Sequence, residues 1–359
     1  LGLLAEEVWA RPEESSDLPT AKRPLEDKES FWWTDLARRS MDVVETCCRS
    51  APRLWFQLDA EGDQVSVLLQ AHAVRERHWF TIRVDDDRLL AACRVPRSTT
   101  KKGEIRESKL SHALEGTDWL GRTTLKVRRP GHRARVAHLE IGATNVTVRL
   151  RRESSRQRLG DVPLTVVRVR EVLDRGRGGD EPIEWNLYTT YPVHSLADAL
   201  EVARCYALRW RIERHHYTTK TGALELPASQ LRSFQARRKW IAMATSVSAH
   251  LQHLVHRART EPDIGAVQEF RPEQIEAVQC VLRGRRMRVP FASVEQATLG
   301  QMVEGLARLG GYQGAKRSGG PAGVVTLTRG MEQMEVACMV LEGLRAGSSA
   351  QGARDEADE

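Results

Sequence analysis

The sequence RLWFQLDAEGD, residues 53–63, places an apolar run of strand length directly before a cluster of acidic residues. An apolar run that stops at an acidic turn predicts a buried β-strand followed by a loop. Residues 64–75 then show apolar residues at helical spacing, and residues 79–84 form a second apolar run. Strand, helix and strand in succession predict an α/β fold.

The residues before this stretch divide into a loop and a helix. Residues 11–30 carry prolines among polar residues, which predicts a loop. Residues 31–48 show helical spacing of apolar residues, and Pro52 ends the run. The chain opens on apolar residues without a methionine or a basic leader. We therefore expect that further residues precede Leu1 and that the opening is no signal peptide.

From residue 97 to 190 the pattern changes to alternating apolar and polar residues, with many arginines. This alternation predicts an antiparallel meander, with a turn at residues 142–145. The chain after residue 195 is mainly helical in pattern and ends in a small, polar, acidic tail that we expect to be disordered. The expected helices cover residues 196–221, 229–259, 272–283, 293–309 and 326–344.

Composition excludes two broad classes of protein. With 41% hydrophobic and 29% charged residues, the chain can bury a core and is no disordered polymer. No apolar run approaches the roughly 18 residues of a membrane span. The formal net charge of +7 points weakly to a polyanionic partner. Six cysteines without a C-x-x-C spacing are expected to be reduced thiols of a cytoplasmic protein.

Four polar residues recur at helical spacing within residues 196–221: Tyr206, Arg209, Glu213 and Lys220. On one continuous helix, at about 100° per residue, they fall within an arc of about 60°. Two cations and a phenol suit phosphate oxygens, and a carboxylate can bind a divalent ion beside a phosphodiester. The alternative is a solvated helix face that contains an Arg209–Glu213 pair.

A hard metal ion needs more than one carboxylate, and Asp59 is the best second candidate. It ends an apolar strand, which is where ligands bind in an open α/β sheet. A simple strand-ending turn is the alternative for Asp59. Glu61 and Asp63 lie further into the turn and could also serve.

The spacing Y-x2-R-x3-E-x6-K resembles the signature of DDE transposases in the fourth insertion-sequence family. Further likeness to that family spans residues 1 to about 345. It is strongest between residues 181 and 249 and patchy in the arginine-rich strands. The phrases that carry it lie at residues 2–12, 191–200, 209–213, 220–223 and 307–317.

The resemblance implies a ribonuclease-H-like catalytic core that is interrupted by a β-rich insertion and followed by a helical C-terminal region. The implied parts are a partial core (1–96), an antiparallel β insertion (97–190), the rest of the core with the catalytic helix (191–260), a helical dimerisation region (261–345) and a disordered tail (346–359). Family members work as homodimers that synapse two transposon ends on double-stranded DNA. No membrane is implied, and the expected location is the bacterial cytoplasm, at the nucleoid.

In this family three carboxylates bind two Mg²⁺ or Mn²⁺ ions, and Asp59 and Glu213 match the second and third. Tyr206, Arg209 and Lys220 match residues that hold backbone phosphates. Trp185 matches an aromatic residue that stacks on a flipped base, although a core tryptophan is the alternative reading.

The sequence departs from the family at the first catalytic aspartate, for which it offers no match. The aspartates before Asp59 do not follow strand patterns, and we expect surface charges at Asp17, Asp27, Asp35 and Asp42. We therefore expect a DNA transposase fragment or truncated form that nicks DNA, forms hairpins and transfers strands. The alternative is a catalytically inactive DNA-binding or inhibitory partner of an intact transposase.

Two further features leave their interpretation open. The densest basic tract, residues 128–158, fits either solvated strand faces or contacts with phosphates. An apolar stripe on the last helix fits either the core or a dimer contact, and consists of Met331, Met334, Cys338 and Leu341.

Overall fold

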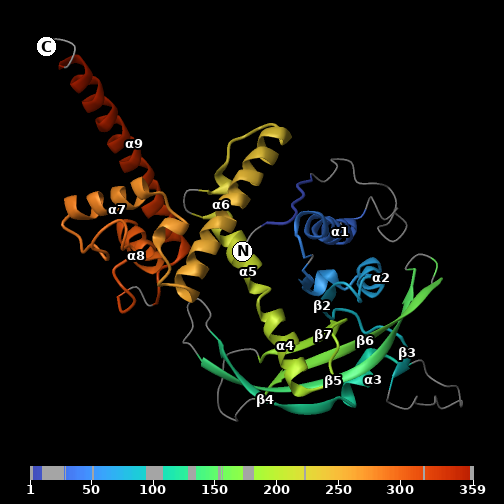
Figure 1. Cartoon of the computed structure of the whole chain (residues 1–359). Helices are drawn as coiled ribbons and strands as arrows, with labels where there is room; N and C mark the ends of the chain where they lie inside the picture. The colour runs from blue at the N-terminus through green and yellow to red at the C-terminus, as the bar shows by residue number, and fades with distance from the viewer. Residues whose placement is uncertain are drawn as a thin grey trace, which may run out of the picture. The chain divides into compact units, whose positions relative to one another are not determined.

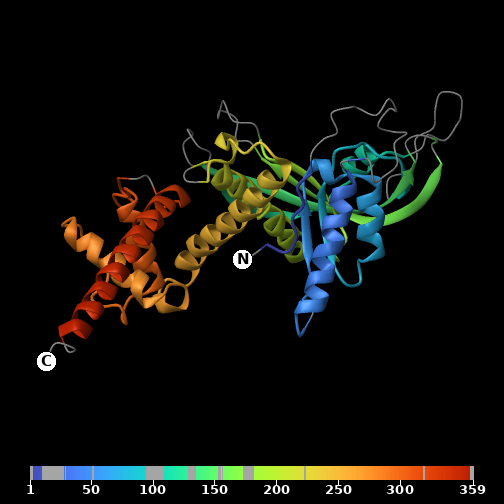
Figure 2. The ribbon, with the colours of Figure 1, turned by 90° about the horizontal axis from the view of Figure 1, so that it is seen from above.

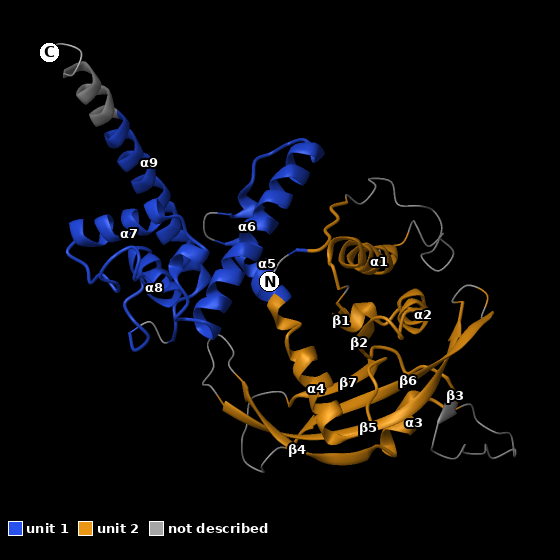
Figure 3. Ribbon diagram, viewed as in Figure 1, with its two compact units in different colours: residues 1–3, 212–359 blue, residues 4–211 orange. Residues whose placement is uncertain are grey.

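The computed structural model describes residues 3–9, 28, 30–50, 52–93, 108–127, 135–152, 155, 157–172, 182–221, 224–317 and 320–355. The chain divides into two compact units, coloured separately in Figure 3. The sheet unit covers residues 4–211, and the helical unit covers residues 212–359 together with residues 1–3.

The sheet unit is built on one seven-stranded mixed sheet (Figure 1). Its strand order is β1-β2-β7-β6-β5-β3, and β4 also pairs with β5. Strands β1 and β2 are parallel, and the other pairings are antiparallel. The predicted α/β segment and the predicted meander therefore share one sheet. The strands are β1 (Trp55–Leu58), β2 (Trp79–Arg83), β3 (Leu90–Cys93), β4 (Asp118–Val127), β5 (Arg135–Arg151), β6 (Arg158–Glu171) and β7 (Glu184–Thr189).

The predicted turn at residues 142–145 is wrong, because β5 runs through it without a break. Gly142 pairs with Arg168 and Asn145 pairs with Thr165 in the β5–β6 register. Gly142 instead permits close packing, since a Cβ atom there would lie 2.5 Å from Cγ2 of Thr117. The glycine that suggested a turn is explained by this close approach.

Both faces of the sheet are buried, as consecutive strand residues show. Val166 belongs to one apolar core and Val167 to another, and successive strand residues point to opposite faces. The first core includes residues from α1 (Ser30–Cys47), α2 (Val65–Ala73) and α3 (Leu110–Glu115). The second core is covered by α4 (Leu196–Ala207), which contacts β5, β6 and β1. Figure 2 shows α1 and α2 running side by side, and their residues are in contact.

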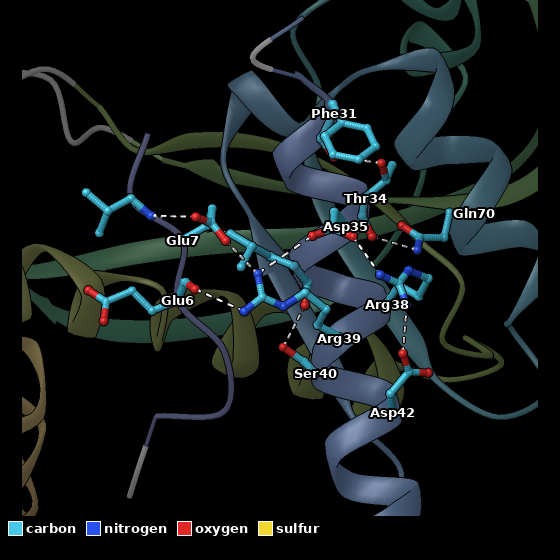
Figure 4. A network of polar contacts seen from close by, with 12 residues as sticks. Glu6, Glu7, Phe31, Thr34, Asp35, Arg38, Arg39, Ser40, Asp42 and Gln70 are labelled. Atoms are coloured by element: carbon cyan, nitrogen blue, oxygen red, sulfur yellow. Dashed lines mark hydrogen bonds and ion pairs between the residues drawn. The ribbon is translucent and has the colours of Figure 1, made fainter. Parts of the chain in front are cut away.

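Residues 3–9 are tied to α1 by Arg39 (Figure 4). Arg39 donates to the Glu7 carboxylate at 2.9 Å and to the Glu6 carbonyl at 3.2 Å. Trp9 stacks on Trp32 with ring centroids 5.6 Å apart. On the same helix, Asp35 and Asp42 both pair with Arg38. Two of the predicted surface charges thus lie in a helix and not at a strand end, while Asp17 and Asp27 lie outside the described residues.

The helical unit has a core formed by four of its helices. Glycines allow two of them to cross closely: a Cβ atom on Gly330 of α9 would lie 1.8 Å from the carbonyl oxygen of Leu306 in α8. A Cβ atom on Gly310 would meet the Thr326 carbonyl oxygen at the same distance, 1.8 Å. The helices of this unit are α5 (Trp210–Lys220, which begins at the unit boundary), α6 (Phe234–Thr260), α7 (Pro272–Gly284), α8 (Leu299–Leu309) and α9 (Val324–Asp355). Short 3₁₀ turns cover Ala60–Gly62 of the sheet unit and Leu226–Ala228 and Ala266–Gln268 of the helical unit.

The apolar stripe predicted on the last helix belongs to this core. Met334 is 0% exposed and Cys338 is 3% exposed, and Met331 and Leu341 pack against the same cluster. Of the two readings left open, the structure supports the core. A second apolar stripe on α9 faces outward, with side chains 56–63% exposed, and consists of Val336, Met339, Val340 and Leu344. Helix α9 extends into the predicted tail, and residues 356–359 lie outside the described residues.

No helix among the described residues has the length and hydropathy needed to cross a membrane.

Candidate active site

Asp59 stands at the carboxyl end of β1, where the sequence places it. It caps the 3₁₀ turn Ala60–Gly62, and its Oδ1 accepts the Glu61 N–H at 3.1 Å. The Asp59 side chain is 34% exposed. Because β1 and β2 are parallel, their carboxyl ends meet at one edge of the sheet, and Asp59 lies at this edge.

Asp63, which the sequence left open as a candidate ligand, has a structural role. Its side chain is 0% exposed, and Oδ1 accepts from Nε of Arg88 at 2.9 Å. Its Oδ2 accepts the backbone N–H groups of Asp85 at 2.9 Å and Asp86 at 3.1 Å. A buried carboxylate with three donors is already fully engaged, whereas Asp59 and Glu61 can be reached by solvent.

Arg209 and Tyr206 lie beside Asp59 at the end of α4. Nη1 of Arg209 is 3.6 Å from Oδ2 of Asp59, and the Arg209 side chain is 13% exposed. The Tyr206 side chain is only 3% exposed, so its hydroxyl is sheltered. Burial is the main cause that raises the pKa of Tyr206, and Asp59 adds to it, while Arg83 and Arg209 oppose the rise.

Trp185 of β7 packs against the aromatic ring of Tyr206. Their ring centroids are 5.3 Å apart in an edge-to-face arrangement. Trp185 is partly buried against the core beneath α4. These contacts suit the core reading, and the predicted stacking on a flipped base remains a prediction.

The prediction of one continuous helix over residues 196–221 is wrong. Helix α4 ends at Ala207, and α5 begins at Trp210. Between them, the N–H groups of Leu208 and Arg209 bond to carbonyls three residues back, on Cys205 and Tyr206. This tighter turn interrupts the helix between Tyr206 and Glu213, so the four motif residues do not lie on one continuous α-helix.

Glu213 and Lys220 share the later helix, α5. Both are exposed, and Glu213 lies in its first turn. Seven residues apart, they differ by about 20° around the helix, so they lie on one face. Glu213 and Lys220 belong to the helical unit, whereas Asp59, Tyr206 and Arg209 come together in the sheet unit.

The donor chemistry fits a hard divalent cation, although a full ligand set is not assembled. The carboxylates of Asp59, which is partly exposed, and Glu213, which is exposed, offer the oxygen ligands that Mg²⁺ and Mn²⁺ prefer. Within the described ranges, no three His, Cys, Asp or Glu side chains gather where they could hold a metal ion.

Several arginines of the β strands are paired with acids. Arg135 pairs with Glu171, and Arg158 pairs with Asp161. Arg170 donates a hydrogen bond to Glu140 at 2.8 Å. Its Cζ also lies 4.5 Å from the centroid of the Trp119 ring, in a cation–π contact. Within the basic tract, the exposed Arg158 fits the solvated-face reading, whereas the Arg135–Glu171 pair is largely buried. The rest of the tract includes residues outside the described ranges, namely Arg128, Arg129, Arg133 and Arg156.

Two arginines near the carboxyl ends of β1 and β2 were not identified from the sequence as part of the site. Arg83, at the carboxyl end of β2, influences Tyr206 electrostatically, and its place at a strand end was a usable signal. Arg88 forms an ion pair with Asp63, which lies 25 residues away in the sequence, and a local sequence pattern does not predict such a pair.

Residues 73–248 match a family model described as Transposase DDE domain. The match includes Trp185, Tyr206, Arg209, Glu213 and Lys220, whereas Asp59 lies before it. It supports a DDE transposase family for this chain. This is a family of phosphoryl-transfer nucleases that act on DNA and generally depend on divalent metal ions. The mixed sheet with a helical region after it is compatible with a DDE nuclease fold.

Proposed function

We propose that the chain is a DNA transposase of the fourth insertion-sequence family. It would move DNA by cut-and-paste transposition, through nicking, hairpin formation and strand transfer at transposon ends. The observation that carries the proposal is the Transposase DDE domain match, which includes the whole Y-x2-R-x3-E-x6-K motif. The partly exposed Asp59 at the carboxyl end of β1 supports it.

Asp59 and Glu213 are the proposed metal ligands. When bound, two Mg²⁺ or Mn²⁺ ions would activate the attacking hydroxyl and neutralise charge on the scissile phosphate. Arg209 and Lys220 would bind the phosphates next to the cleaved end. Tyr206 would remain protonated, because its pKa is raised mainly by burial, and it could then donate its O–H.

The first carboxylate of the family has no counterpart among the described residues. Strand β1 pairs with β2 on one side, and no described strand pairs with it on the other side. We assign the first carboxylate to a further strand that pairs with β1, since such a strand would end near Asp59.

We further propose a homodimer that synapses two DNA ends. The outward-facing stripe on α9 supports it, because side chains at i, i+3, i+4 and i+8 form one apolar face. This stripe is distinct from the buried one that the sequence analysis singled out.

The alternative function is a catalytically inactive DNA-binding or inhibitory partner of an intact transposase. It is favoured by one observation: the described residues do not assemble three metal ligands.

The test uses the protein in its full-length form, with duplex DNA taken from both sides of its own reading frame. The expected result is a nick and then a hairpin that require Mg²⁺ or Mn²⁺. Glu213→Gln should abolish both products without weakening DNA binding. Glu201→Gln, an exposed acid on the neighbouring α4, should retain them. Cleavage by Glu213→Gln would refute the proposal.

Binding without cleavage, together with inhibition of an active transposase, would instead support the alternative.

A further inference from the structure

Asp59 and Arg209, which the proposed function assigns to a metal ion and to a phosphate, contact each other. Oδ2 of Asp59 lies 3.6 Å from Nη1 of Arg209, and the two side chains are 34% and 13% exposed. Salt screens such a sheltered pair less than it screens exposed charges. In the free protein each group therefore acts as a counter-ion of the other.

The Asp59 carboxylate is held so that one oxygen can change partners. Oδ1 accepts the Glu61 N–H at 3.1 Å and fixes the carboxylate at the head of the turn. Oδ2 faces Arg209. Arg209 lies in the turn between α4 and α5, next to the exposed Leu208 and Trp210, so its long side chain starts from a boundary between two helices.

We propose that the Asp59–Arg209 ion pair couples the two ligands of the active site, so that a divalent cation at Asp59 and a DNA phosphate at Arg209 strengthen each other's binding. This inference rests on the proposed function and specifies how its site is regulated. A cation that takes Oδ2 of Asp59 removes an anion from Arg209, whose guanidinium then gains more from a phosphate. By linkage, a phosphate at Arg209 raises the affinity of Asp59 for the cation by the same factor.

The first experiment measures duplex DNA affinity by fluorescence anisotropy in EDTA, so that no metal is involved. Asp59→Asn keeps an acceptor for the Glu61 N–H and removes the anionic partner at 3.6 Å from Arg209, so it should tighten DNA binding by about threefold or more. In the Arg209→Gln background the same change should have no such effect. Glu61→Gln, which removes a nearby charge, should act equally in both backgrounds.

The second experiment measures Mn²⁺ affinity by electron paramagnetic resonance, without DNA. Arg209→Gln should bind Mn²⁺ about threefold or more tightly than the unmodified protein, because the cation 3.6 Å from Asp59 is removed. Arg204→Gln, an arginine on α4 that is 73% exposed, should leave the Mn²⁺ affinity unchanged.

Two results would contradict the coupling even if DNA and Mn²⁺ both bind. The first is that Asp59→Asn changes DNA affinity by the same factor in the unmodified protein and in Arg209→Gln. The second is that Arg209→Gln leaves Mn²⁺ affinity unchanged. If the unmodified protein binds neither Mn²⁺ nor duplex DNA, the proposed function fails, and the coupling fails with it.

Discussion

The buried carboxylate of Asp63 binds Nε of Arg88 at 2.9 Å and so joins the end of β1 to the turn after β2. The same carboxylate receives the N–H groups of Asp85 and Asp86. This clamp lies at the sheet edge that carries Asp59. We infer that it keeps the carboxyl ends of the two parallel strands in register for the site.

Breaking this clamp should destabilise the sheet unit. Asp63→Asn removes the charge opposite Arg88 and places an amide donor among N–H donors, which should cost about 3–5 kcal/mol of unfolding free energy. Asp86→Asn is the matched control, because Asp86 also contacts Arg88 but is 64% exposed. Its cost should stay below about 1 kcal/mol. Urea unfolding followed by circular dichroism checks both, and equal effects would contradict the structural role of Asp63.

The close crossing of α8 and α9 predicts opposite effects for two glycine substitutions on one helix. Gly330→Ala would place a Cβ atom 1.8 Å from the Leu306 carbonyl oxygen, so the helices would have to separate. The expected loss is at least about 2 kcal/mol. Gly343→Ala meets nothing within 4 Å and should gain about 0.5–1 kcal/mol from helix propensity. Thermal unfolding distinguishes the two, and a stable Gly330→Ala protein would contradict the crossing.

Tyr206 should ionise only at high pH. Its pKa is raised, first by burial and then by Asp59, against the opposing effect of Arg83 and Arg209. Because the pKa in the folded state exceeds that of the unfolded chain, about 10, the stabilisation is complete below that value. It is lost as the pH rises through the folded-state pKa. Ultraviolet titration of tyrosinate checks this by difference from Tyr206→Phe, and a midpoint at or below about 10 would contradict it.

The local elements around the site were predictable, because their signals are local. Residues 53–63 predicted both a strand and the acidic turn, and the structure has β1 followed by a 3₁₀ turn at that place. The break between α4 and α5 was not predictable in the same way, because residues 208 and 209 are Leu and Arg, and neither is a helix breaker.

Packing decided the features that the sequence could not reveal. Gly142 is typical of a turn, yet it lies within β5, where Thr117 from another part of the chain leaves no room for a Cβ atom. Asp59 and Asp63 are the same residue type in the same acidic turn. Only the structure shows that Asp63 is buried and paired with the distant Arg88, whereas the Asp59 side chain is 34% exposed. The burial of Tyr206 likewise depends on Trp185, which comes from β7.

The outward stripe on α9 predicts self-association. Met339→Glu should shift a dimer towards monomer, because Met339 is 63% exposed and lies in the middle of the apolar face. Val267→Glu changes another exposed apolar residue of the same unit and should leave the dimer intact. Sedimentation velocity measures both. A monomer at all concentrations of the unmodified protein would refute the proposed dimer contact.

The most direct test of the account asks whether Asp59 and Glu213 share one metal site. When hydrogen peroxide is added, Fe²⁺ bound in place of Mg²⁺ is oxidised to Fe³⁺ and splits the peroxide into hydroxide and a hydroxyl radical, which cuts the protein backbone next to the metal ligands. A shared metal site should give cuts near both residues, and both cuts should be suppressed by excess Mg²⁺ and lost in Glu213→Gln. Cuts near only one of the two residues, or cuts that excess Mg²⁺ does not suppress, would contradict a shared metal site.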